Sequence, residues 1–274
     1  GATSDTLDLS QKLGGHRPTV LRVVSLFTAA FTTLDLSDNL LLAEGAQAIA
    51  DALVSGSILT KLNLSDNELG PEGGRAIAEA LKHQQSVLTS LSLFNNSIGQ
   101  GGAEALADAL QSNIVLTSLD LGANQLDAQA GKQLAEALLV NTSLRLLNLD
   151  RNCLGAEGAS AIAELIKSGQ GPLAAISIAD NQLCVMQSHG QHIYNDSGIK
   201  AIASSLADSK FLTSLNVRKN DLDAHAAKAF AKALAANATV NQFQLDMRSN
   251  RIGDKDEPAV RECVKGHKWF ALLV

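Results

Sequence analysis

Residues 59–81 read LTKLNLSDNELGPEGGRAIAEAL and contain the unit from which most of the chain is built. The apolar residues Leu62 and Leu64 alternate with polar neighbours, which is the two-residue period of a short strand with one buried face. The unit then passes through Asn67 and a glycine-rich stretch into an alanine-rich segment. In that segment Ile77 and Leu81 are four residues apart, as on one face of a helix. The sequence therefore predicts one strand and one helix in each unit.

The asparagine of this unit recurs at intervals of 28 or 29 residues along most of the chain. It is found at Asn39, Asn67, Asn96, Asn124, Asn152 and Asn181. A fixed period of this length is typical of a solenoid, in which each unit buries its apolar face against its neighbours. We expect the strands to form a parallel sheet and the asparagine amides to pair with backbone groups at the strand ends.

Two further positions of the unit recur. A glycine near the start of each helix is expected to make a tight turn, and a glutamate is expected to begin the helix, where negative charge is favourable. The glycines are Gly45, Gly73, Gly102 and Gly158, and the glutamates are Glu44, Glu72, Glu104 and Glu157. Because the glutamates recur with the repeat, we interpret them as structural and not catalytic.

The segments LTSLSLFNNSIGQGGAEALADAL and LRLLNLDRNCLGAEGASAIAEL closely resemble the ribonuclease-inhibitor-like class of leucine-rich repeats. The resemblance implies an α/β right-handed solenoid, or horseshoe, with a parallel β-sheet on the concave face and α-helices on the convex face. The class includes ribonuclease inhibitors, sensor regions of NOD-like receptors and Ran GTPase-activating proteins, which are united by protein binding. This chain departs from ribonuclease inhibitors in its few cysteines, and from Ran activators in having no acidic tail.

We expect a single leucine-rich-repeat domain over residues 1–274. Residues 1–30 would form an N-terminal capping repeat, and residues 31–250 about eight repeats with an insertion near 182–197. Residues 251–274 would form a C-terminal cap or a truncated repeat.

The two ends of the repeat series carry more detailed predictions. An apolar capping helix is expected at residues 19–27, and another strand is expected to start at Phe270, with Trp269 covering the last repeat. In the last full repeat, we place Gln244 beside Asn216 and Asp246 beside Arg218, so that Asn250 comes two residues late.

The balance of charge is mildly acidic, with 22 lysines and arginines against 28 acidic residues and a formal net charge of −6. This disfavours nucleic acid as a partner, because phosphate binding needs clustered positive charge. There is no apolar run long enough for a membrane span, so no membrane partner is expected. The three cysteines Cys153, Cys184 and Cys263 are widely spaced and suggest a reducing, intracellular (cytoplasmic) compartment. We expect a monomer in isolation.

Asn-x-Ser/Thr triplets are expected by chance in a repeat so rich in these residues, and we do not predict glycosylation from them. They begin at Asn63, Asn95, Asn141, Asn195 and Asn237.

The residues between the buried strand positions should point outward and form the partner-binding face. The candidates are Asp35, Lys61, Asn63, Ser92, Phe94, Asp120, Leu146, Asn148, Asp150, Asn216 and Arg218. Among them Phe94 and Arg218 stand out, because aromatic and arginine side chains are common binding hot spots. The alternative is a solvated sheet face without a partner.

The insertion is a second candidate for partner contact, through Met186, His189, His192 and Tyr194, because unusually long loops are often functional. Cys184, His189 and His192 could supply three zinc ligands, but structural zinc sites usually have four, so no metal is predicted. A plain surface excursion is the alternative interpretation.

The sequence lacks the motifs GxxxxGK[ST], HExxH and GxSxG, so we predict no catalytic residues, no cofactor and no enzyme activity. The predicted function is a protein-interaction module, part of a larger protein, that presents a rigid concave surface to a protein partner. One alternative is a GTPase-activating-type regulator of a small GTPase. Another is a structural component of a cytoskeletal or ciliary assembly.

Overall fold

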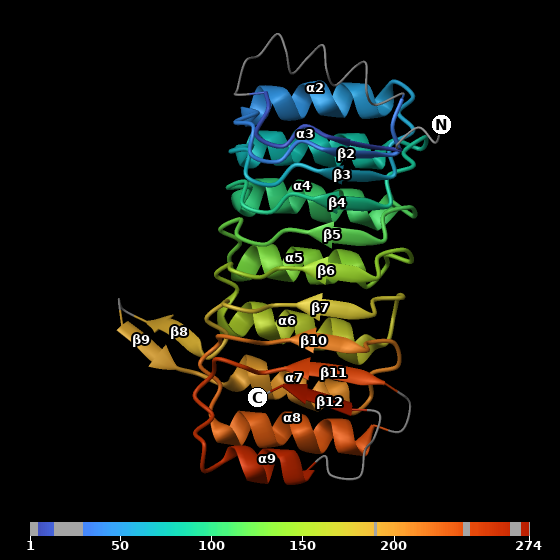
Figure 1. Cartoon of the computed structure of the whole chain (residues 1–274). Coiled ribbons are helices and arrows are strands. Elements are labelled where there is room, and N and C mark those ends of the chain that lie inside the picture. Colours follow the sequence, from blue (N-terminus) through green and yellow to red (C-terminus); the bar gives the residue numbers. More distant parts are fainter. Residues whose placement is uncertain (1–4, 14–29, 189–190, 238–241, 264–269, 274) are drawn as a thin grey trace. The chain divides into compact units, whose positions relative to one another are not determined.

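The computed structural model describes residues 5–13, 30–188, 191–237, 242–263 and 270–273 (Figure 1). The chain forms two compact units, Gly1–Gln125 with Asn141–Leu147 and Leu126–Val140 with Asn148–Val274. The expected capping helix at residues 19–27 and Trp269 lie outside the described residues. The single-domain assignment stays a prediction.

The first unit alternates strands and helices. Its strands are β1 (Thr6–Asp8), β2 (Thr33–Asp35), β3 (Lys61–Asn63), β4 (Ser90–Ser92) and β5 (Ser118–Asp120), and its helices are α2 (Leu42–Val54), α3 (Gly70–Lys82) and α4 (Gly99–Ser112). Each strand pairs in parallel with the next one along the chain. Successive helices pack on one another along one side of these strands (Figure 1). The predicted alternation of strand and helix is confirmed.

The second unit continues this pattern and adds a hairpin. Its helices are α5 (Ala128–Leu138), α6 (Gly155–Ser168), α7 (Ser197–Leu206), α8 (Ala224–Ala236) and α9 (Glu257–Cys263), and its strands include β7 (Ala175–Ser177), β10 (Ser214–Asn216), β11 (Phe243–Asp246) and β12 (Phe270–Leu273). These four strands are parallel neighbours in the order β7-β10-β11-β12. The short strand β6 (Leu146–Asn148) has residues in both units.

The 182–197 insertion folds as an antiparallel hairpin of β8 (Val185–Ser188) and β9 (Gln191–Tyr194). The hairpin projects away from the neighbouring strand β7 in Figure 1. The sequence analysis located the extra residues but did not predict their structure.

The core lies between strands and helices. In the first unit the central strand leucines Leu34, Leu62 and Leu91 are aligned in register and are almost completely buried. The helix residues Ile77 and Leu81 are buried too, as predicted from their spacing. Burial of one such side chain contributes about 1.5–3 kcal/mol, so the regular repetition of leucine accounts for most of the stabilisation.

The repeated asparagines pair with the backbone as predicted. The Nδ2 of Asn67 donates to the carbonyl oxygens of Leu36 at 2.9 Å and Leu64 at 3.0 Å. Its backbone N–H donates to the Oδ1 of Asn96 at 3.0 Å, and its own Oδ1 accepts from the N–H of Asn39 at 2.9 Å. Each asparagine therefore links its own turn to the turns of neighbouring repeats.

A second set of buried asparagines, which the sequence analysis did not identify, follows the helices. It consists of Asn113, Asn141 and Asn237. The Nδ2 of Asn141 donates to the Leu110 carbonyl at 2.7 Å, and its Oδ1 accepts from the N–H of Leu144 at 2.7 Å. Asn141 and Asn237 are only 4% exposed. Each of these asparagines begins an Asn-x-Ser/Thr triplet, and its side chain is thus shielded in the folded chain.

The expectation that the recurrent glycines make turns is wrong. Gly73 is the fourth residue of α3 and is buried, and a Cβ on it would lie 2.7 Å from the Leu69 Cβ and 3.1 Å from the Ala46 Cβ. The glycine is therefore needed for close packing inside the helix. The turn is made earlier, at Gly70, where φ is +64°.

The glutamates match their prediction in part. Glu44, Glu72 and Glu157 lie in the first turns of α2, α3 and α6. The first turn of α4 contains no acidic residue, so the assignment of Glu104 to a helix start is wrong.

The register predicted for the last full repeat is also wrong. Asp246 pairs with Asn216, and the Oδ1 of Asn250 accepts from the N–H of Asn220 at 2.8 Å. Asn250 therefore occupies its regular place, and Met247 fills a buried strand position. The strand expected near Phe270 is present as β12, parallel to β11. In the part of the chain that the structure describes, every helix is too short or too polar to span a lipid bilayer.

Candidate functional site

We use the term strand face for the side of the strands that points away from the helices. In the first unit its predicted residues are joined by hydrogen bonds. The Nδ2 of Asn63 donates to Asp35 Oδ2 at 2.9 Å, and the hydroxyl of Ser65 donates to Asn63 Oδ1 at 2.6 Å. The hydroxyl oxygens of Ser65 and Ser92 are 2.9 Å apart. Three predicted residues from three strands thus form one connected network, and Lys61 stands exposed beside it.

Phe94 lies half-buried on this face, against a glycine of the next repeat. A Cβ on Gly122 would be 2.8 Å from Phe94 Cδ2, so the aromatic ring occupies the space that the glycine leaves free. Asp120 is held beside it, since its Oδ1 accepts from the Gly122 N–H at 2.9 Å. Leu146 is 49% exposed and does not belong to the core.

The strand face of the second unit carries a similar network. The Oδ1 of Asp150 accepts from the Ser177 hydroxyl at 2.5 Å and from the Ala179 N–H at 2.7 Å. Asn216 Nδ2 donates to the Ser177 oxygen at 2.8 Å, and Asn148 Oδ1 accepts from the Asp150 N–H at 2.9 Å. The structure therefore brings together Asn148, Asp150 and Asn216, which the sequence only placed on a common face.

Burial raises the pKa of Asp150 above its ordinary value. The hydrogen bonds from Ser177 and Ala179 and the positive charges of Arg218 and Arg151 act in the opposite direction but do not cancel the effect. The folded chain thus holds the Asp150 proton more tightly than the unfolded chain does. This carboxyl group stabilises the fold below its ordinary pKa of 3.8, and that contribution is lost as the pH rises through the folded pKa.

We predict that Asp150→Asn is at least as stable as the unchanged chain at neutral pH, and that this advantage disappears below about pH 4, near the ordinary pKa of aspartate. The amide is neutral at every pH and keeps an oxygen for Ser177 and Ala179. Urea denaturation at the two pH values measures the effect, with the exposed Asp208→Asn as the control. A variant that loses stability at neutral pH but not in acid would contradict the prediction.

Arg218 and Asp246 lie on the same face, in neighbouring repeats. Asp246 is buried, and burial acts to raise its pKa, but the hydrogen bonds from Arg248 outweigh this and lower the pKa of Asp246. The Nε of Arg218 is buried and has no hydrogen-bond acceptor among the described residues. Arg218 was predicted as a candidate, and Asp246 was placed on the outward face but two residues out of register and was not chosen; Arg248 was not identified.

The hairpin is anchored at its base by Cys184 and Tyr194. Cys184 is a free, buried thiol, and burial raises its pKa to about 12, so it is protonated and unreactive at neutral pH. Tyr194 is hydrogen-bonded to Cys184 and Asp223, and burial of its hydroxyl raises its pKa as well. His189 lies outside the described residues, and so do the side chains of Met186 and His192. The described residues contain no group of His, Cys, Asp or Glu arranged to hold a metal ion.

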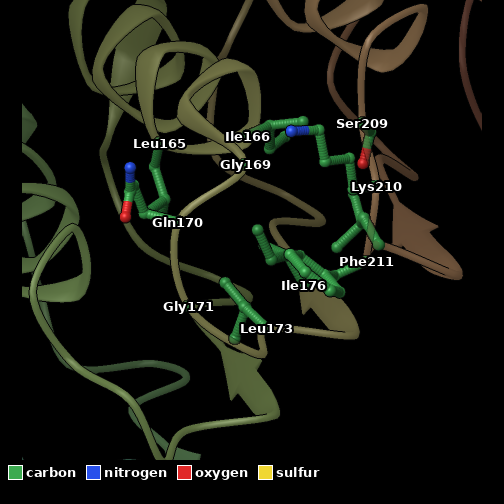
Figure 2. Close-up of a pocket in the computed structure, with 11 residues that line it drawn as sticks. Leu165, Ile166, Gly169, Gln170, Gly171, Leu173, Ile176, Ser209, Lys210 and Phe211 are labelled. Atoms are coloured by element: carbon green, nitrogen blue, oxygen red, sulfur yellow. The ribbon is translucent and has the colours of Figure 1, made fainter.

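A small hollow lies between the end of α6 and the segment that leads into β10 (Figure 2). It is lined mainly by apolar residues, among them Leu165, Ile166, Ile176 and Phe211. Its volume is about 20 Å³, which is room for roughly one water molecule. The hollow is therefore too small to serve as a ligand site.

Comparison with known families identifies the repeat. A family model described as Leucine Rich repeat matches residues 31–50, 57–78, 84–107, 140–163 and 208–231. These five segments are similar to leucine-rich repeats. The repeats of the chain also fill the stretches between the matched segments, where β5, α5, β7 and α7 lie.

A solved leucine-rich-repeat structure agrees with this fold, and two further structures are similar to part of the chain. The leucine-rich repeat-containing protein LegL7 from Legionella pneumophila is 20% identical and has a TM-score of 0.57. The alignment covers 89% of this chain and 73% of the LegL7 chain. The actin-binding site 2 of leiomodin-1 is 22% identical, with coverage of 58% and 86% and a TM-score of 0.49. The tropomodulin C-terminal domain of Caenorhabditis elegans is 14% identical, with coverage of 60% and 92% and a TM-score of 0.46. A search of the curated proteins finds no match.

The α/β leucine-rich-repeat solenoid predicted from the sequence is confirmed. At 20% identity the LegL7 structure supports the fold alone. Leucine-rich repeats are in general binding modules, so the matched segments suggest protein–protein interaction.

Proposed function

We propose that this leucine-rich-repeat chain binds a protein partner through the strand face of its repeats. The observation that carries the proposal is the network of hydrogen bonds that joins outward side chains of neighbouring strands. Asn63 is bonded to Asp35 in the first unit, and Ser177 to Asp150 in the second. Because these side chains are ordered before a partner arrives, little conformational entropy is lost on binding.

The strand face of each unit carries residue types that protein interfaces use. In the first unit Phe94 offers an aromatic ring and Leu146 an exposed aliphatic side chain, and in the second unit Arg218 offers a guanidinium group. Such residues supply most of the binding energy when they lie near the centre of an interface. The polar network around them would form the hydrogen-bonding rim of that interface.

We further propose that the repeats belong to the ribonuclease-inhibitor-like class, because a full helix of 13 or 14 residues follows the strand in several of them. A chain of this kind would serve as the recognition part of a larger protein. Regulation of a small GTPase and a place in a cytoskeletal or ciliary assembly remain the two alternatives, and the identity of the partner distinguishes them.

Site-specific photo-crosslinking in cell lysate tests the proposal. A photoreactive phenylalanine analogue is placed in turn at Lys61 on the strand face, at Gln111 on α4 and at Ile193 on the hairpin, all of which are exposed. We expect one protein to be crosslinked from Lys61 and not from Gln111. The yield should fall several-fold when Phe94→Ala is added, because the aromatic contact is lost.

Each pattern of crosslinks has a distinct meaning. Crosslinks from Ile193 alone would move recognition to the hairpin, and crosslinks from Gln111 alone would move it to the helices. Either result, or no crosslink at any position, would contradict binding through the strand face. A crosslinked small GTPase would favour the regulator, whereas a protein captured only as an assembled polymer would favour the structural component.

A further inference from the structure

Four cationic residues follow the neighbouring strands β10 and β11, two after each strand, and three of them are paired. Lys219 is 3.0 Å from Asp180, Arg248 is 2.7 Å from Asp246, and Arg251 is 2.9 Å from Asp221. The fourth is Arg218, which has no ion pair with any described residue. Arg218 is therefore the cation of this group whose charge is available to a partner.

The hydrogen-bonding capacity of Arg218 is unused as well. Its backbone N–H donates to Asn216 Oδ1 at 3.1 Å, but its buried Nε finds no acceptor among the described residues. A buried donor without an acceptor is costly, and a folded protein rarely keeps one without a reason. The buried Nε is out of reach of a partner, but the two terminal nitrogens of the guanidinium group are not among the buried atoms and form no hydrogen bond with a described residue, so a partner could supply their acceptor.

The nearby carboxylates are engaged with other groups. Asp150 uses its Oδ1 for Ser177 and Ala179, and both oxygens of Asp246 accept from Arg248. Arg218 influences the titration of both carboxyl groups by its charge, yet it forms an ion pair with neither. Neither acid therefore neutralises the guanidinium group by contact.

We infer that Arg218 is the anchor for a carboxylate of the protein partner, the side chain of an aspartate or a glutamate. This inference rests on the proposed function and specifies its chemistry. A guanidinium group binds a carboxylate through two parallel hydrogen bonds, a geometry that lysine does not reproduce. The acids around Arg218, among them Asp150 and Asp246, would repel a doubly charged phosphate more strongly than a singly charged carboxylate. The site therefore favours an acidic side chain over a phosphorylated one.

A display library of random peptides, panned against the full chain, tests this inference. We expect peptides that bind the strand face to share an aspartate or glutamate at one position. Arg218→Ala should weaken these peptides at least tenfold, as should replacement of the shared acid by its amide. The two changes together should weaken binding little more than either alone, because they remove the same contact.

Matched variants keep the outcome interpretable. Arg251→Ala removes an arginine of the same group that is paired with Asp221, leaves the pair of Asp246 and Arg248 intact, and should change binding much less. Arg218→Lys keeps the charge without the two-pronged geometry, and should restore only part of the affinity. Thermal melting shows that each variant is folded before it is compared.

The failure of this inference is distinguishable from failure of the proposed function. Peptides that bind the strand face but need no acidic residue, or that bind Arg218→Ala unchanged, would overturn the inference and leave the strand-face proposal standing. Peptides that bind only elsewhere, or no enriched peptide at all, would overturn both.

Discussion

Replacing Gly198 by alanine is expected to lower the free energy of unfolding of the second unit by about 3 kcal/mol or more, because the substitution overpacks a filled contact. Gly198 is the second residue of α7 and lies against α6. A Cβ at this position would be 2.2 Å from the carbonyl oxygen of Ala156 and 2.7 Å from the Cβ of Ala159. The first of these atoms belongs to the backbone of a helix, so it cannot move aside without shifting α6.

Urea denaturation of Gly198→Ala, followed by circular dichroism, measures this loss. Gly253→Ala is the matched control, since a Cβ at Gly253 would meet no atom within 4 Å. The control should unfold like the unchanged chain. If Gly198→Ala is as stable as the unchanged chain, the result would contradict the close contact of Gly198 with α6.

Asn124→Leu is expected to lower the free energy of unfolding by several kcal/mol. Each buried polar group that loses its hydrogen-bond partner costs about 1–3 kcal/mol, and the substitution removes several partners. The Oδ1 of Asn124 accepts from the N–H groups of Asn96 at 3.0 Å and Ile98 at 3.2 Å. Its Nδ2 donates to the carbonyls of Leu93 at 2.8 Å and Gly122 at 3.0 Å. Leucine has nearly the same size but can neither donate nor accept a hydrogen bond.

Chemical denaturation again provides the measurement, and Gln111→Leu controls for the introduction of a leucine at an exposed position. Asn124→Asp separates the two halves of the interaction, because aspartate retains the acceptor but not the donor. Our account of the repeated asparagines fails if Asn124→Leu is as stable as Gln111→Leu.

Much of the fold was predictable because the sequence pattern within one repeat is enough to predict the strand and the helix of that repeat. The structure confirms three features that the sequence pattern predicted. These are the strand at Leu62 and Leu64, the buried asparagine Asn67, and the buried helix face with Ile77 and Leu81. The second set of asparagines carries a weaker signal. Asn113 and Asn141 are also 28 residues apart, but they follow helices and not the conspicuous leucine-rich strands.

The errors occurred where local sequence admits two solutions. Near β11 the apolar residues Phe243, Leu245 and Met247 alternate with polar ones. The repeated pair of buried residues could therefore be Phe243 and Leu245 or Leu245 and Met247, and the apolar pattern alone could not decide the register. The hydrogen bond between Asn220 and Asn250 decided it in the fold. Gly73 is compatible with a turn and with a tight helix contact, and the neighbouring helix determined which one occurs.

For the candidate site, the sequence predicted which residues face outward but not how they pair. Asp150, Ser177 and Asn216 are separated by 27 and 39 residues along the chain, and only the stacking of strands brings them into one network. The same stacking pairs Lys219 with Asp180 and Arg251 with Asp221, and it leaves Arg218 without an ion pair among the described residues. These pairings depend on distances between repeats, which no single repeat encodes.

The sequence by itself determined the repeat, the strand and helix within it, and the outward positions, because these follow from periodicity within one unit. Only the tertiary structure decided the hairpin at residues 185–194, the register of the last repeat, and the available guanidinium of Arg218. Each of these depends on which backbone and side-chain groups meet across neighbouring strands and helices, and such contacts are settled by packing and hydrogen bonding in three dimensions.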